Sequence, residues 1–227
     1  MKKSTATVIL AFIVCFVTLS AANLKLKKAY DKGEIKTLFI TRPLPPFSYV
    51  KETMNEVPFA DYRCTIAIKS STENTSGVDS LSAANVDFNV INDTLFITPS
   101  KEAVTTNTPM YSRININATH LKGIIARKNT INFTGGRSGD DSLTVTAFGR
   151  SQVNLSNIKT GAISINASGT SKVTIEATDS INNVIVNLKD KSCFSANNVI
   201  LKRKVLHMSD SCSLQLTGKS IVDFGIK

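Results

Sequence analysis

The later half of the chain repeats with a period of 20 or 21 residues, and this period limits the possible folds more than any other feature. Four copies of 14 residues align without gaps, at offsets of 20, 21 and 20 residues. Such a unit is too short for two-helix repeats, which need about 33 residues or more, and it suits one coil of a β-solenoid. The copies are Ser142–Leu155, Ala162–Ile175, Asn183–Ala196 and Arg203–Leu216.

Within each copy, apolar and polar residues alternate along two short runs, which predicts two strands that each bury one face. Across the copies, the inward positions form five apolar files, and only Lys204 interrupts them. We expect the coils to stack with equivalent strands in parallel register, so that each file becomes a ladder inside the protein. The files are Leu143/Ile163/Val184/Lys204, Val145/Ile165/Val186/Leu206, Ala147/Ala167/Leu188/Met208, Val153/Val173/Phe194/Leu214 and Leu155/Ile175/Ala196/Leu216.

A tight corner separates the two runs of each copy. Gly and Asp both tolerate turn conformations, and they alone occupy the corner position, as Gly149, Gly169, Asp190 and Asp210. We expect each coil to run as strand, corner, strand and polar return. A weaker copy precedes the others, with its apolar positions at Leu121, Gly123, Ile125, Ile131 and Phe133.

The composition agrees with a β-rich domain. Ser, Thr and Asn supply 67 of the 227 residues, and these short polar side chains suit the solvent face of strands better than helices. A hydrophobic fraction of 42% excludes a disordered chain. The sequence therefore predicts an all-β fold with a parallel β-solenoid stack of coils of about 20 residues. An antiparallel meander or sandwich is the alternative that the pattern leaves open.

A leading strand and hairpin region is expected before the coils. Tyr62–Lys69 alternates as a strand, and Val86–Val90 and Thr94–Thr98 flank the turn dipeptide Asn92-Asp93 as a hairpin. Alternation resumes from Ile114 to Ala118. The polar segments Ser70–Gly77 and Pro99–Pro109 are expected to be loops.

The N-terminus has the layout of an export signal. A basic start precedes the apolar run Val8–Leu19 and the small residues Ser20–Ala22. Residues 1–22 are therefore either a cleaved signal peptide or an N-terminal membrane anchor that uses residues 8–24. In both cases the chain is exported, to the periplasm, the cell surface or the medium. Residues 23–58 are expected to form an extended linker or an arm that covers a sheet edge, and residues 59–227 a single domain.

Three segments resemble the "putative auto-transporter adhesin, head GIN domain" family of exported bacterial proteins. They are Val90–Ile97, Ile114–Ile124 and the tandem motifs Phe148–Leu155 and Ser168–Ile175, and the resemblance covers about residues 59–227. It implies a right-handed β-helix-like stack and a role in adhesion, without catalytic residues. The later copies depart from the family pattern at Asp190, Asp210 and Lys202–Lys204.

No catalytic, cofactor or metal site is expected. The chain has two His and no Trp, and it contains no CxxC motif. Asp190 and Asp210 are interpreted as turn formers rather than cation ligands. Ser151, Ser171, Ser192 and Cys212 are expected to form a hydrogen-bonded ladder. Without the signal, Cys64, Cys193 and Cys212 remain, so that one disulfide is possible and its partners are open.

The net charge of +10 is interpreted first as a diffuse charge that keeps the domain soluble, and an anionic partner is the alternative. The outward residues Arg150, Lys172 and Lys191 lie near the same corner, where they would form a basic stripe for surface glycans, phospholipid headgroups or another envelope component. Nucleic acid is not expected, because aromatic residues do not alternate with the basic ones.

We therefore expect a non-enzymatic exported cell-envelope protein that binds glycans or surfaces as an adhesion domain. Two alternatives stay open. One is an enzyme that acts on polysaccharides, because β-helices also carry such activities. The other is a scaffold whose coils stack end to end, which the basic segment Lys202–Lys204 near the last coil argues against.

Overall fold

A computed structural model describes residues 3–31, 39–54, 62–106, 110–135, 142–176 and 180–223. The chain divides into two units, Met1–Leu38 and Phe39–Lys227. The first unit contains helix α1 (Lys3–Asp31), which carries the apolar run. Residues 23–31 thus continue the helix, and their assignment to an extended linker is wrong. Within the described residues, no helix combines the length and apolarity that crossing a membrane requires.

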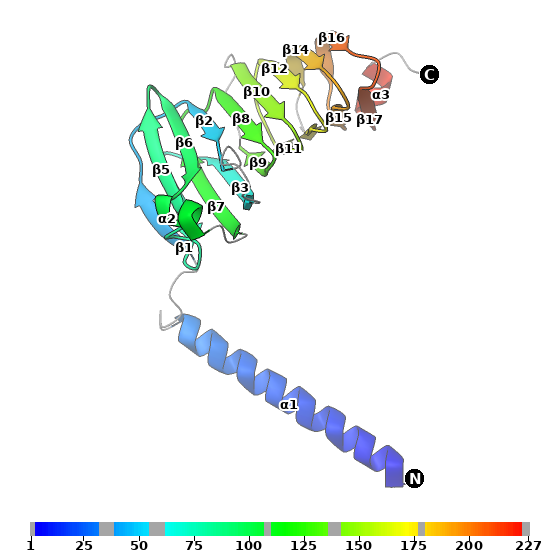
Figure 1. Ribbon diagram of the computed structural model, residues 1–227. Helices are drawn as coiled ribbons and strands as arrows, with labels where there is room; N and C mark the ends of the chain where they lie inside the picture. Colours follow the sequence, from blue (N-terminus) through cyan, green and yellow to red (C-terminus); the bar gives the residue numbers. More distant parts are fainter. Residues whose placement is uncertain are drawn as a thin grey trace. The chain divides into compact units, whose positions relative to one another are not determined.

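The second unit is built from two mixed sheets around one hydrophobic core (Figure 1). We call the nine-stranded sheet sheet A and the eight-stranded sheet sheet B. Sheet A has the order β1 (Phe39–Pro43), β4 (Thr75–Asp79), β7 (Met110–Ala118), β3 (Tyr62–Ser70), β9 (Thr130–Thr134), β11 (Gln152–Ser156), β13 (Lys172–Glu176), β15 (Cys193–Asn197) and β17 (Ser213–Thr217). Sheet B has the order β16 (Leu201–Met208), β14 (Ile181–Leu188), β12 (Ala162–Ala167), β10 (Ser142–Phe148), β8 (Gly123–Arg127), β2 (Tyr49–Glu52), β6 (Thr94–Pro99) and β5 (Val86–Ile91).

The register of the later strands confirms the alignment of the copies. Each copy places its first strand in sheet B and its second in sheet A, and every pairing between successive copies is parallel. Leu143 lies opposite Ile163 and Val153 opposite Val173, as the files require. The expectation of an all-β fold is confirmed.

For the weak earlier copy, the register predicted from the sequence is wrong in the first strand. Ile124 and Ala126, rather than Gly123 and Ile125, lie opposite Val145 and Ala147. Its second strand agrees with the prediction, since Ile131 and Phe133 pair with the file that begins at Val153. The physical reason is a corner that is one residue shorter in this coil, so that a constant spacing misplaces the strand before it.

The leading region confirms the predicted hairpin. β5 and β6 pair antiparallel, and Asn92 and Asp93 between them have φ values of +48° and +62°. The two expected loops need correction, because the first contains strand β4 and the second contains helix α2 (Lys101–Thr106). Helix α2 begins after Ser100, whose Oγ accepts a hydrogen bond from the amide of Ala103, as an N-cap does.

Residues 39–54 belong to the sheets and not to a linker. β1 pairs with β4 at the edge of sheet A, which matches the alternative of an edge-covering arm, and Pro43 closes this strand where a missing donor is tolerated. β2 lies between β6 and β8 in the interior of sheet B. The prolines that suggested a linker therefore flank strands instead of excluding them.

The inward files are buried along the whole stack until its last coil. Ile165, Val186 and Phe194 have no exposed surface, whereas Leu206 and Leu214 in the last coil are half-buried. Lys204, which interrupts one file, turns its Nζ to the carbonyl oxygen of Leu201 at 3.1 Å. Helix α3 (Lys219–Asp223) lies beside this last coil.

A buried carboxylate joins the leading region to the first coil. Glu52 at the end of β2 is fully buried, and it accepts hydrogen bonds from the amides of Met54 (2.6 Å) and Arg127 (2.9 Å). It also accepts one from the Asn129 side chain at 2.7 Å, while the Asn129 Oδ1 atom accepts the amide of Cys64 at 2.9 Å. One side chain thus connects β2 with the corner between β8 and β9 and, through Asn129, with β3.

The first prediction tests the inward files. Ile165→Ala should lower the free energy of unfolding by about 2–5 kcal/mol, because it leaves a cavity in the middle of the stack. The matched control is Ser164→Ala, one residue away on the outward face, with a change below about 0.5 kcal/mol. Urea denaturation followed by circular dichroism measures both. Equal effects at the two positions would contradict the assignment of inward and outward faces.

The second prediction concerns Glu52. Glu52→Ala should lower the free energy of unfolding by about 3 kcal/mol or more, since it leaves three donors buried without their acceptor. Lys51→Ala, on the neighbouring outward position, should cost less than about 1 kcal/mol. If the Glu52 variant unfolds at the same urea concentration as the wild type, the buried network does not hold the two regions together.

Candidate functional site

The corners between the two sheets are held in place by their own backbone. The amide of Thr170 donates to the carbonyl of Gly149 at 2.7 Å, and the amide of Lys191 donates to that of Gly169 at 2.9 Å. Gly169 has φ +73°, and a Cβ there would lie 2.8 Å from the Gly149 carbonyl oxygen, so this position requires glycine. Successive corners therefore stack in fixed register.

Asp190 behaves as the turn former that the sequence indicated. It adopts φ +59°, and its Oδ2 accepts a hydrogen bond from the amide of Gly169 in the coil below at 2.9 Å. Asp210 does not share this conformation, which limits the corner pattern to the earlier coils. Among the described residues, no group of three His, Cys, Asp or Glu side chains could hold a metal ion.

Ser171 and Ser192 bind the backbone rather than one another, whereas the buried Oγ of Ser151 has no hydrogen-bond partner among the described residues. Ser171 Oγ donates toward the carbonyls of Ser168 (2.8 Å) and Ala147 (3.2 Å), and Ser192 Oγ makes the equivalent contacts with Lys189 and Ala167. The expected hydroxyl ladder is therefore wrong except at its end, where Ser192 Oγ lies 3.7 Å from Cys212 Sγ. The hydroxyls of Ser171 and Ser192 therefore stabilise the corner backbone and do not face solvent.

All four cysteines are free thiols, so none of the possible disulfides is formed. Cys64 is buried, and burial, followed by the charge of Glu52, raises the pKa of its thiol far above the ordinary value. Cys193 begins β15 on the outward parity of sheet A, whereas Cys212 lies at the last corner. Cys212 Sγ instead lies 3.2 Å from Ser209 Oγ and 3.7 Å from Ser192 Oγ.

The three predicted binding residues do not all share one surface. Arg150 and Lys191 are exposed at equivalent corner positions two coils apart, with Thr170 between them. Lys172 begins β13 and is half-buried, and its Nζ donates to Gln215 Oε1 at 3.3 Å along the outer face of sheet A. The structure therefore brings Arg150 and Lys191 together and directs Lys172 away from them.

Three further basic residues join the same corner. Arg127 and Lys128 form the corner of the first coil, and Lys189 precedes Asp190 in the fourth; all three are exposed. The sequence interpretation missed the first two because the weak copy was out of register. We name the five exposed residues the basic corner: Arg127, Lys128, Arg150, Lys189 and Lys191.

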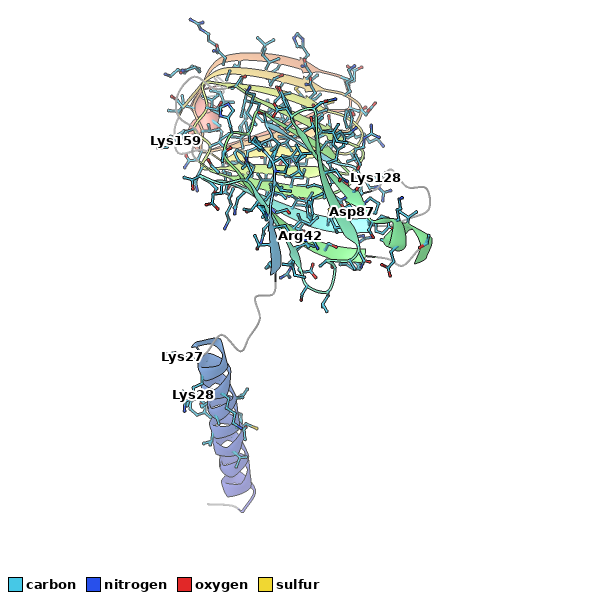
Figure 2. All side chains as sticks on the ribbon, turned by 90° about the vertical axis from the view of Figure 1, so that its left-hand side faces the viewer. Lys27, Lys28, Arg42, Asp87, Lys128 and Lys159 are labelled. Atoms are coloured by element: carbon cyan, nitrogen blue, oxygen red, sulfur yellow. The ribbon has the colours of Figure 1, made fainter. Side chains whose placement is uncertain are left out.

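The basic corner has a defined place and spacing. Coils stack about 4.8 Å apart, so its cations extend over three intervals, or roughly 14 Å, from the first coil to the fourth. The corners of the stack contribute only two carboxylates, Asp190 and Asp210, and the first of these is engaged by the Gly169 amide. Lys128 lies on this edge, and Lys159, in a return between coils, lies on the opposite edge (Figure 2).

A shallow groove of about 220 Å³ lies elsewhere, on the outer face of sheet A. Its lining is mainly uncharged, with one aromatic ring, Phe39, and one cation, Lys69; Gly77 and Ala67 lack the side chains that would fill it. The strands that form the groove, β1, β4, β7 and β3, precede the coils. This groove is thus separate from the basic corner in both position and charge.

No family model matches the chain, and no curated protein matches it. Among solved structures, it is similar to a "putative adhesin" from Parabacteroides distasonis, with 14% identity over 79% of this chain and 78% of that one and a TM-score of 0.49. A "putative adhesin" from Bacteroides fragilis shows 16% identity over 80% and 97% of the chains, with a TM-score of 0.47. One from Parabacteroides merdae shows 13% identity over 79% and 94%, with a TM-score of 0.44. At these values the likenesses decide neither the family nor the ligand, and the head GIN resemblance stays a prediction from the motifs.

Proposed function

We propose that this chain is a non-enzymatic, exported binding domain whose basic corner holds an anionic glycan of the cell envelope. The observation that carries the proposal is the basic corner itself, with five exposed cations on the first, second and fourth coils. Export is inferred from the signal-like residues 1–22. The anchor alternative finds no support, since residues 8–24 belong to α1 and, within the described residues, no helix is long and apolar enough to cross a membrane. A phospholipid headgroup of the envelope would offer the same negative charge as an anionic glycan. The experiment below separates these two sources.

We also infer that the coils form a right-handed parallel β-helix. Parallel pairing in both sheets at every step from β8 to β16 and from β9 to β17 supports this geometry. Crossover connections between parallel strands of one sheet are right-handed in roughly 98% of cases, which favours that hand here. A β-helix would present equivalent side chains in straight rows along its axis.

Cations spread along one edge of the stack suit a linear polyanion. Backbone hydrogen bonds fix the corners, so little conformational freedom of the main chain is lost when a ligand binds across several coils. A polysaccharide with a carboxylate on each sugar would meet cations of the first, second and fourth coils along this edge. Because these cations are exposed, each contact is weak and is screened by salt, and affinity comes from their number.

The third prediction tests this proposal with a linear polyuronate. Wild-type protein should bind polygalacturonate at low ionic strength and release it as salt rises. Reversal of two charges in Arg150→Glu/Lys191→Glu should weaken binding about tenfold, since two attractions become repulsions. Isothermal titration calorimetry measures the dissociation constant.

The matched control reverses two charges away from the basic corner, in Lys159→Glu/Lys202→Glu. It makes the same change in net charge and should weaken binding far less. An equal loss in both variants would show that only overall charge matters and would contradict the proposed site. Binding to phosphatidylglycerol vesicles but not to polygalacturonate would replace the glycan by a lipid headgroup as the partner.

A further inference from the structure

The outer face of sheet B carries an aromatic side chain in an unusual setting. Tyr49 begins β2 and lies opposite Thr94 on β6 and opposite Gly123 on β8, and Gly123 lies opposite Thr144 on β10. At all four positions the side chain, or at Gly123 the place of the missing one, faces away from the core. The ring thus belongs to the solvent side of a continuous row that crosses four strands.

Gly123 makes room for the ring. A Cβ at this position would lie 2.5 Å from Cδ1 and 2.8 Å from Cε1 of Tyr49, so the ring occupies the space that a side chain would take. Tyr49 therefore leans over the glycine backbone, yet it keeps 38% of its surface exposed. A ring held against the sheet has already lost most of its rotational freedom, which lowers the cost of binding a ligand on its free surface.

The surroundings of the ring are polar and basic. Thr94 is half-buried and Thr144 exposed on the two sides of Tyr49. Next along β2, the Lys51 ammonium lies 5.4 Å from the centre of the Phe96 ring. Among the described residues, the outward positions of β2, β6, β8 and β10 include no acidic side chain.

This combination matches the chemistry of a sugar ring. One face of a pyranose exposes C–H groups, which pack on an aromatic face, while its rim carries hydroxyls that need donors and acceptors. Tyr49 offers the first, and the threonine hydroxyls and the Lys51 ammonium offer the second. We propose that Tyr49, with Thr94, Thr144 and Lys51, binds one sugar ring of a neutral glycan.

A lipid surface fits these residues less well. Insertion into a membrane requires a broad apolar surface, whereas hydroxyls lie beside Tyr49 on β6, at Thr94, and beyond Gly123 on β10, at Thr144. The proposal does not depend on the basic corner, because the contacts are short-ranged and uncharged apart from Lys51. High salt should therefore abolish binding at the basic corner and leave binding at Tyr49 in place.

The experiment uses the full chain and a panel of immobilised neutral hexasaccharides of β-glucan, xylan and mannan type, in 0.5 M NaCl. We expect the wild type to bind at least one of them. Tyr49→Ala should weaken that binding at least tenfold, and Tyr49→Phe, which keeps the ring, should stay within about threefold. Tyr111→Ala is the control, because Tyr111 is a 71% exposed ring in sheet A and its removal should change nothing.

Several results would overturn the proposal. One is the absence of binding to every neutral glycan of the panel, and another is unchanged binding by Tyr49→Ala with an unfolding midpoint like that of the wild type. Adsorption to phosphatidylcholine vesicles that Tyr49→Ala abolishes would identify a lipid surface instead. The Arg150→Glu/Lys191→Glu variant should bind the neutral glycan normally, so that failure of this site and failure of the basic corner are told apart.

Discussion

Backbone pairing between successive coils is the constraint on which the rest of the structure depends. Because side chains alternate across a strand, a slip of one residue would turn every apolar file to solvent. The corners oppose such a slip: Gly149 and Gly169 adopt positive φ, and the amide of Thr170 bonds to the carbonyl of Gly149. Register and burial thus stabilise each other along the stack.

The same register decides what the surface can do. Outward side chains at equivalent positions come within reach of one another, and many bond along the stack, as Asn154 does to Asn132 (2.7 Å) and Asn187 to Asn166 (2.9 Å). Such amide ladders use their polar groups to stabilise neighbouring strands. The basic corner and the surroundings of Tyr49 differ from these ladders, because charge or an aromatic ring takes the place of paired amides there.

The sequence predicted the parts of the fold that repeat. The five files and the hairpin turn at Asn92-Asp93 follow from local patterns, and the strands confirm them. What it missed depends on long-range contacts. Nothing in the residues around Glu52 predicts that its carboxylate will accept a hydrogen bond from the amide of Arg127, 75 residues away. Strand β2 was not predicted because it follows a proline-rich segment. Two of the five residues of the basic corner, Arg127 and Lys128, were missed for a related reason, since the shorter first corner shifted their register.

The two proposed sites use different physics, and the difference gives each a distinct role. Charge acts over about 8 Å at physiological ionic strength, so the proposed site at the basic corner would attract a polyanion before contact and without distinguishing its sugars. Packing on Tyr49 acts only at contact and depends on the shape of one sugar ring. Arg127 of the basic corner has its guanidinium 5.4 Å from the ring of Phe148, and Phe148 lies on the outer face of sheet B, which also carries Tyr49. A glycan with both acidic and neutral sugars could therefore meet both sites on one surface, with charge governing its capture and the ring governing its selection.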